Sequence, residues 1–215
     1  MRVPLACAGV LALMVTVMAQ NSKAPALNLQ GDRFKPLTYD KLTPAQKTMA
    51  DHLMSGERAS MGGPFNVLLR SPEMGDLAQQ LGAQVRFHSS LPRKLNELAI
   101  IMVARHWTAH YEWYAHKRAA LENGLAPAIV DAVALGKRPA QMTPEEAVIY
   151  GFTDELLRTK QVSDATFQAA AKAFGERGVV DLVGVIGYYQ LVSSILNVDR
   201  YPLPDGVKPE LVALK

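Results

Sequence analysis

Helix-start signals recur along this chain and leave little room for any other regular structure. Thr43-Pro44-Ala45-Gln46 and Thr143-Pro144-Glu145-Glu146 each combine an N-cap threonine, a first-turn proline and a Gln or Glu that can return a hydrogen bond to the cap. Apolar residues follow at three- and four-residue spacing, whereas sustained strand-type alternation is absent from the sequence. The sequence therefore predicts an all-α fold.

Further helices are expected after similar signals, at Ser71-Pro72, Leu91-Pro92, about Thr108, Pro127 and Ser163-Asp164. The helix after Ser71 is predicted to bury an apolar stripe on one face. The members of this stripe are Met74, Leu77, Leu81 and Val85. The last long segment, 179–196, is apolar on nearly all sides, which favours the centre of a bundle or contact with another subunit. We expect one domain of about seven to eight helices that forms a homo-oligomer.

The N-terminus has the three-part pattern of a secretory signal peptide. One arginine precedes the uncharged, mostly apolar stretch 5–18, and Val17-Met18-Ala19 supplies small residues before a cleavage point. Cleavage after Ala19 is predicted, with an uncleaved membrane anchor as the alternative. We expect an exported protein, periplasmic or secreted. No membrane contact is expected after cleavage, because no later run is both long and apolar enough without interruption by charge.

Composition shifts define the expected organisation. The signal peptide at 1–19 precedes an arm at 20–41, which carries Pro, Asn, Gly and Lys without helical periodicity. The helical domain is expected at 42–204 and a C-terminal tail at 205–215. The hydrophobic fraction of 49% excludes a disordered chain.

Charge and cysteine content exclude several classes of function. The only cysteine, Cys7, lies in the predicted signal peptide, so an intramolecular disulfide, a Cys-x-x-Cys pair and a multi-cysteine zinc site are impossible. The 23 basic residues nearly balance the 20 acidic ones, and no basic stripe with interleaved aromatic residues stands out. Nucleic acid is therefore not an expected partner.

A polar cluster in the middle of the chain is the candidate site. Glu112 and His116 are four residues apart, so their side chains meet on one helical face. Glu97 lies among apolar neighbours, where burial raises the pKa of a carboxyl and a nearby histidine shares its proton. Such a pairing suits general acid–base chemistry. The alternatives are a solvated Glu–His pair and a Glu97 side chain paired with Arg105 or Lys94.

Metal binding is not expected. His106 and His110 could share a helical face, but His110 and His116 are six residues apart and face different directions. A His-Glu-x-x-His pattern is absent from the sequence.

The chain resembles the carboxymuconolactone decarboxylase family, which includes the alkylhydroperoxidase D-like proteins. The resemblance covers about 42–204 and rests on several motifs in the same order along the chain. These are Gly63-Pro64-Phe65-Asn66, Leu69-Arg70-Ser71-Pro72, Leu91-Pro92-Arg93, Glu97-Leu98-Ala99-Ile100, Tyr111-Glu112-Trp113 with His116, Phe152-Thr153-Asp154-Glu155-Leu156-Leu157, Gly187-Tyr188-Tyr189 and Leu196-Asn197. It implies an all-helical alkylhydroperoxidase D-like bundle that assembles as a trimer or hexamer.

The resemblance also implies which chemistry is missing. In the thiol-using branch of the family, a glutamate, two cysteines and a histidine form a proton-relayed site. The glutamate matches Glu97 and the histidine matches His116, but the cysteine positions hold Ala109 and Glu112. Thiol peroxidase chemistry by that route is therefore not expected.

The implied function is that of a cofactor-free lyase, a decarboxylase-like enzyme acting on a small lactone or organic acid. His116 would transfer the proton. Glu112 would orient His116 or act as the acid, and Glu97 would complete the relay. Arg105 or Arg93 would hold a substrate carboxylate, and Trp113 would form a wall of the pocket. The alternatives are an alkylhydroperoxidase D-like antioxidant and a non-catalytic exported oligomer that binds a small ligand.

Overall fold

The computed structural model describes residues 26–213, and the predicted signal peptide lies outside them. This part of the chain contains eight α-helices, one short 3-10 helix and no strand, which confirms the all-α prediction. The elements are η1 (Tyr39–Lys41), α1 (Pro44–Ser55), α2 (Phe65–Leu68), α3 (Pro72–Phe87), α4 (Arg93–His106), α5 (His110–Glu122), α6 (Pro127–Ala134), α7 (Pro144–Thr159) and α8 (Asp164–Asp199).

The predicted helix starts are formed as the sequence indicates. Thr43 and Thr143 each accept a hydrogen bond from the backbone N–H of the third helical residue. The side chains of Gln46 and Glu146 accept one from the backbone N–H of the cap residue. Both capping boxes are therefore complete. Within α8 the backbone leaves helical geometry at Gly175, where φ is 69° and ψ is 172°. The break divides α8 into a short helix before Gly175 and a long one after it.

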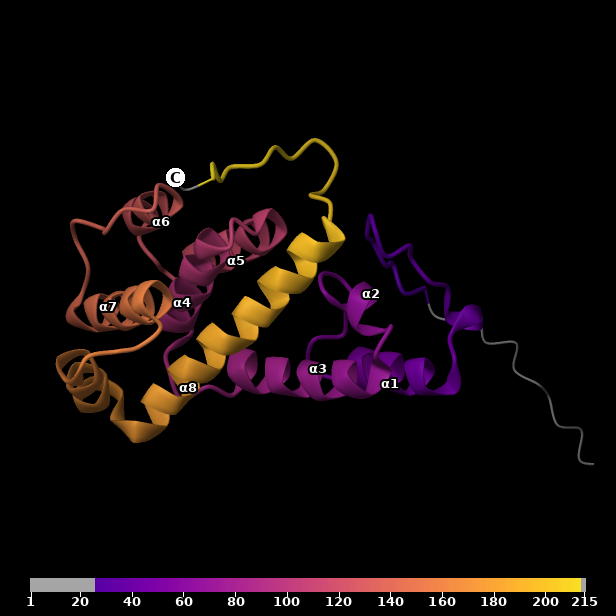
Figure 1. Ribbon diagram of the computed structural model, residues 1–215, viewed down its shortest axis with the longest axis horizontal. Helices are drawn as coiled ribbons and strands as arrows, with labels where there is room; N and C mark the ends of the chain where they lie inside the picture. The colour runs from indigo at the N-terminus through magenta and orange to yellow at the C-terminus, as the bar shows by residue number, and fades with distance from the viewer. Residues whose placement is uncertain (1–25, 214–215) are drawn as a thin grey trace, which may run out of the picture.

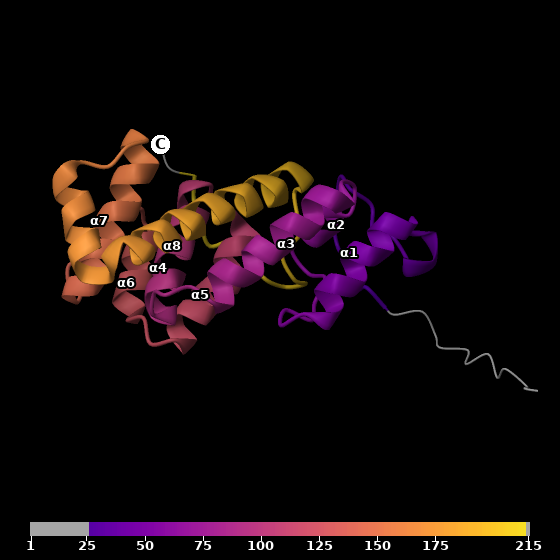
Figure 2. The same cartoon turned by 90° about the horizontal axis from the view of Figure 1, so that it is seen from below.

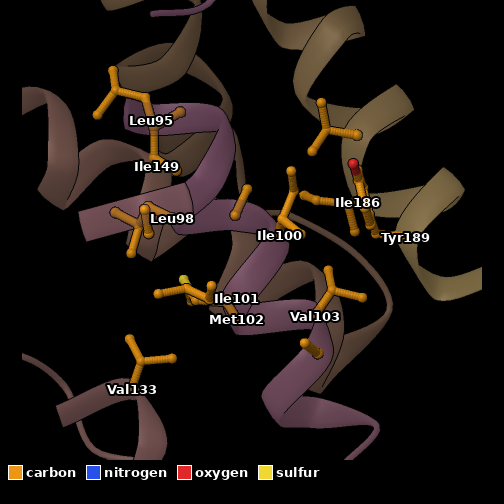
Figure 3. Packing of buried hydrophobic residues seen from close by; sticks show 14 of the residues in the cluster. Leu95, Leu98, Ile100, Ile101, Met102, Val103, Val133, Ile149, Ile186 and Tyr189 are labelled. Atoms are coloured by element: carbon orange, nitrogen blue, oxygen red, sulfur yellow. The ribbon is translucent and has the colours of Figure 1, made fainter. Parts of the chain in front are cut away.

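The long part of α8 runs diagonally across the molecule (Figure 1). Helices α4 to α7 lie on one side of it and α1 to α3 on the other. Seen from below, α6 and α7 lie toward one end of the molecule and α1 and α2 toward the other (Figure 2). Helix α4 lies at the centre of the larger group, because it packs against α5, α6, α7 and α8. Most of α4 is buried, and Figure 3 shows its side chains packed against Val133, Ile149, Ile186 and Tyr189 from three neighbouring helices. A second apolar core holds α1, α2 and α3 together.

The predicted apolar stripe of α3 is wrong for three of its four members. Met74, Leu77 and Leu81 are 48%, 69% and 48% exposed, and only Val85 is buried. The buried face instead carries Gly75 and other small side chains. Small residues are required there because neighbouring helices approach the α3 backbone closely.

One helix in the described part, α8, is long and apolar enough to cross a membrane by length and composition. This differs from the expectation that no later run would qualify. Half of the relevant window is buried inside the fold, and Gly175 interrupts the helix. The apolar character of α8 is thus used largely for packing against α3, α4, α5 and α7.

Both described ends of the chain are tied to the helices. In the arm, the backbone N–H groups of Asp32 and Phe34 donate to the buried Asp199 carboxylate at the end of α8. In the tail, Glu210 accepts hydrogen bonds from Trp113 and Lys117 on α5.

Candidate active site

Glu97 lies in the middle of α4 and has no exposed surface. It is buried because α4 is enclosed by four other helices. One turn earlier, Arg93 donates from Nε to Glu97 Oε1 across 3.2 Å. A buried carboxylate therefore has one partner on its own helix.

The second half of the site comes from α5. Thr108 takes a left-handed conformation, with φ of 48°, which separates α4 from α5 and lets α5 begin at His110. Glu112 and His116 are one turn apart on α5 and are both buried. Their side chains meet as predicted, with 3.1 Å between His116 Nε2 and Glu112 Oε1.

His116 joins the two helices. Its Nδ1 lies 2.6 Å from Glu97 Oε2, so the imidazole stands between two carboxylates. Tyr189 of α8 packs edge-on against the ring, with 4.9 Å between the ring centroids and 78° between the planes. The solvated Glu–His pair and the pairing of Glu97 with Arg105 or Lys94 are therefore wrong.

The electrostatics of this line of three residues favour a charged histidine. Burial by itself lowers the pKa of His116, but the charges and hydrogen bonds of Glu112 and Glu97 outweigh burial and raise this pKa to about 9. Burial likewise raises the pKa of Glu97, yet the hydrogen bond and charge of His116, with Arg93, leave it below its ordinary value. At neutral pH an imidazolium therefore donates from both nitrogens, and Glu97 is a carboxylate.

A cavity of about 510 Å³ lies beside these residues. Glu112 and His116 line it, whereas Glu97 is not among its lining residues and lies behind His116. Eight of the 17 other lining residues are tyrosines or arginines. They are Tyr111, Tyr114, Tyr188, Tyr189, Arg58, Arg86, Arg93 and Arg118.

Two predicted substrate contacts lie elsewhere. Arg105 is buried two turns further along α4, donates to the carbonyl of Val212 and lines a separate cavity of about 360 Å³. Trp113 is 1% exposed, and its indole N–H donates to Glu210 in the tail. Neighbouring helical residues point about 100° apart, so Trp113 cannot share the direction of Glu112. Of the two candidate arginines, only Arg93 lines the cavity.

Sequence reasoning missed Arg58 and Arg86 as cavity residues. Arg58 comes from the loop after α1 and Arg86 from the last turn of α3. No local motif marks either residue, because the cavity forms only when α3, α5 and α8 pack together. Tyr188 and Tyr189 could have been found, because they belong to the family motif that the sequence carries.

One family model matches the segment that carries Glu97, Glu112 and His116. The model of the carboxymuconolactone decarboxylase family matches residues 72–155. The match spans 84 of the 215 residues, so it shows a likeness over this segment. The matched segment runs from the start of α3 into α7, so it contains Glu97, Glu112 and His116, whereas Arg58 and α8 lie outside the match.

A solved structure shares the fold. It is a protein of unknown function from Agrobacterium tumefaciens, described as a candidate antioxidant defence protein AhpD. The two chains are 18% identical with a TM-score of 0.56, and the match covers 66% of this chain and 98% of that one. A search of curated proteins finds no match to the chain. At this identity the likeness shows that the two chains share an all-helical fold.

Proposed function

We propose that the protein is an enzyme that moves protons to and from carbon in a small organic acid or lactone, by Glu/His chemistry without a cofactor. One observation carries the proposal. Glu97, His116 and Glu112 form a continuous buried line of hydrogen bonds, and the last two open onto a cavity rich in arginine. A charged acid–base pair at the wall of an anion-attracting cavity suits proton transfer on an organic anion.

A decarboxylation illustrates the roles. The bond between the carboxylate carbon and its neighbour breaks, its electron pair moves into an adjacent carbonyl as an enolate, and carbon dioxide leaves. A proton must then reach the carbon, and the Glu112 carboxylate at the cavity wall is placed to relay a proton that it takes from His116. The His116 imidazolium is placed to resupply that proton through Nε2. Glu97 touches only His116 and Arg93 among the site residues, so it acts as a positioning residue.

The test is solvent-deuterium exchange and carbon dioxide release, followed by NMR over a panel of carboxylated lactones and unsaturated organic acids. In Glu112→Gln and His116→Gln we expect the rate with the active compound to fall by about a hundredfold or more. Glu176→Gln, an exposed position on α8, is the matched control and should keep the wild-type rate. Near-wild-type rates in both site variants would contradict the proposal.

An antioxidant role is the second candidate, because the Agrobacterium neighbour is described in those terms. A dithiol mechanism needs thiols where this chain has Ala109 and Glu112, and its single cysteine is Cys7. The test measures peroxide consumption with a dithiol reductant in wild type and in Cys7→Ser. Consumption by both proteins would favour this candidate over proton transfer on an organic acid.

The proposed reaction takes place outside the cytoplasm. The pattern of residues 1–19 supports export, with removal of the segment after Ala19. The substrate would then be a compound that the exported enzyme meets in the periplasm or the medium.

A further inference from the structure

The arginines that line the cavity fall into two groups. Arg93 is paired with Glu97, and Arg118 is paired with Glu122 at 3.1 Å. Arg58 and Arg86 form no ion pair with any acidic side chain in residues 26–213. No ion pair within this part of the chain therefore neutralises their positive charges at the cavity wall.

The unpaired atoms belong to three residues that line one cavity, Arg58, Arg86 and Tyr188. Nε and Nη2 of Arg58, Nε of Arg86 and the Tyr188 hydroxyl are all buried, and none has a hydrogen-bond partner within the described part of the chain. Tyr188 is 3% exposed, and all three side chains line the same cavity as Glu112 and His116. Leaving buried donors unsatisfied is costly, so this cluster calls for an acceptor from outside the chain.

The two guanidiniums are held in place by aromatic rings. Arg58 lies over Phe65 with 5.1 Å from its guanidinium carbon to the ring centroid, and Arg86 lies over Phe87 at 5.4 Å. Stacking fixes the plane of a guanidinium but leaves its N–H edge free. Burial raises the pKa of Tyr188, and the positive charges of Arg58 and Arg86 partly oppose that rise. The pKa of Tyr188 stays above its ordinary value, so its hydroxyl remains a donor at neutral pH.

We propose that Arg58, Arg86 and the Tyr188 hydroxyl bind a carboxylate of the substrate while Glu112 and His116 act on the rest of the molecule. The inference rests on the proposed function and names its substrate class: organic acids that carry an ionised carboxylate, in preference to neutral lactones. Planar guanidiniums match the two oxygens of a carboxylate. The cavity of about 510 Å³ is large enough for a small organic molecule.

The test compares two probes that differ in one group, γ-butyrolactone and γ-butyrolactone γ-carboxylate, by isothermal titration calorimetry on the purified protein. Wild type should bind the carboxylate at least about tenfold more tightly than the neutral lactone. Arg58→Gln and Arg86→Gln should each remove about tenfold of that affinity and leave the neutral lactone unaffected. Tyr188→Phe should have a smaller effect of the same sign, because a neutral donor contributes less than a charged one.

Two controls separate recognition from loss of structure. Arg177→Gln removes one positive charge from an exposed position on α8 and should leave both affinities unchanged. Arg58→Lys and Arg86→Lys keep the positive charge but lose the two parallel N–H donors of the guanidinium. Their affinity for the carboxylate probe should lie between those of wild type and the Gln variants. Circular dichroism melting of each variant shows that the fold is intact before any affinity is compared.

The outcomes also separate this inference from the proposed function. Equal affinity of wild type for the two probes, or unchanged carboxylate affinity in both Gln variants, overturns the carboxylate subsite even if Glu112→Gln abolishes turnover. If the Gln variants lose carboxylate affinity while Glu112→Gln keeps full turnover, the subsite stands and the proposed function fails.

Discussion

His116 is the side chain on which the site depends, because it is the only group that touches both carboxylates. Buried between Glu97 and Glu112, it holds a proton that it would release near pH 6.5 in an unfolded chain. Removing that proton in the folded state leaves two buried carboxylates facing a neutral ring. The protonation of one imidazole therefore links catalysis and stability.

This link predicts how stability depends on pH. The pKa of His116 is raised to about 9 in the folded state, so its contribution is fully present below about pH 6.5 and is lost as pH rises through about 9. Between these values the free energy of unfolding should fall with rising pH, by at most about 1.4 kcal/mol per pH unit from this group. Urea denaturation at pH 6.5, 8 and 9.5 measures the fall.

His116→Gln is the control for that measurement, because glutamine does not titrate. The variant should be less stable than wild type at pH 6.5, and the difference between the two proteins should shrink toward pH 9.5. Parallel pH profiles for the two proteins would show that His116 is not the group responsible.

The helices show where sequence patterns decide the structure and where they do not. Capping boxes mark the starts of α1 and α7 correctly, because a cap is a local arrangement of four residues. The buried face of α3 was mispredicted, because periodicity finds an apolar stripe but not the element that covers it. Gly75 and Gly82 lie on the covered face, where Met49 and Tyr188 occupy the space that a larger side chain would need.

Two glycines inside helices test this account of α3. A Cβ at Gly82 would lie directly against the Tyr188 hydroxyl, whereas a Cβ at Gly151 on α7 would meet nothing within 4 Å. We expect Gly82→Ala to destabilise the fold by about 1–3 kcal/mol through overpacking. Gly151→Ala should stabilise it by about 0.4–1 kcal/mol, because alanine restricts the unfolded chain. Urea denaturation of both variants measures the contrast, and equal effects would refute the close packing of α3 on α8.

The site residues likewise fall into those that local sequence patterns predict and those that depend on how distant helices pack. The spacing of Glu112 and His116 on one helix predicted their contact, and the family resemblance brought Glu97 to the same point from α4. Arg58 and Arg86 could not be predicted, because a loop and the end of α3 meet only after α8 has packed between the two groups of helices. Arg105, which the sequence analysis offered as a substrate contact, lines the other cavity, because it lies two turns along α4 from Glu97.

The folded chain leaves apolar surface that a single copy does not cover. Leu77 on α3 and Val180 on α8 are each 69% exposed, and Met74, Leu81 and Val183 are close to half exposed. Exposed apolar side chains of this size on neighbouring helices are typical of a subunit interface. We therefore keep the sequence-based prediction of a homo-oligomer as a proposal and assign its contact to this surface of α3 and α8.

Light scattering coupled to size-exclusion chromatography tests the assembly. The wild-type protein should have the mass of three or six chains. The double variant Leu77→Glu/Val180→Glu should have a mass closer to that of one chain, because burying unpaired carboxylates in the interface opposes association. Val212→Glu, at a position 80% exposed in the tail, should leave the mass unchanged. A wild-type mass of one chain would mean that α3 and α8 carry this apolar surface for another purpose.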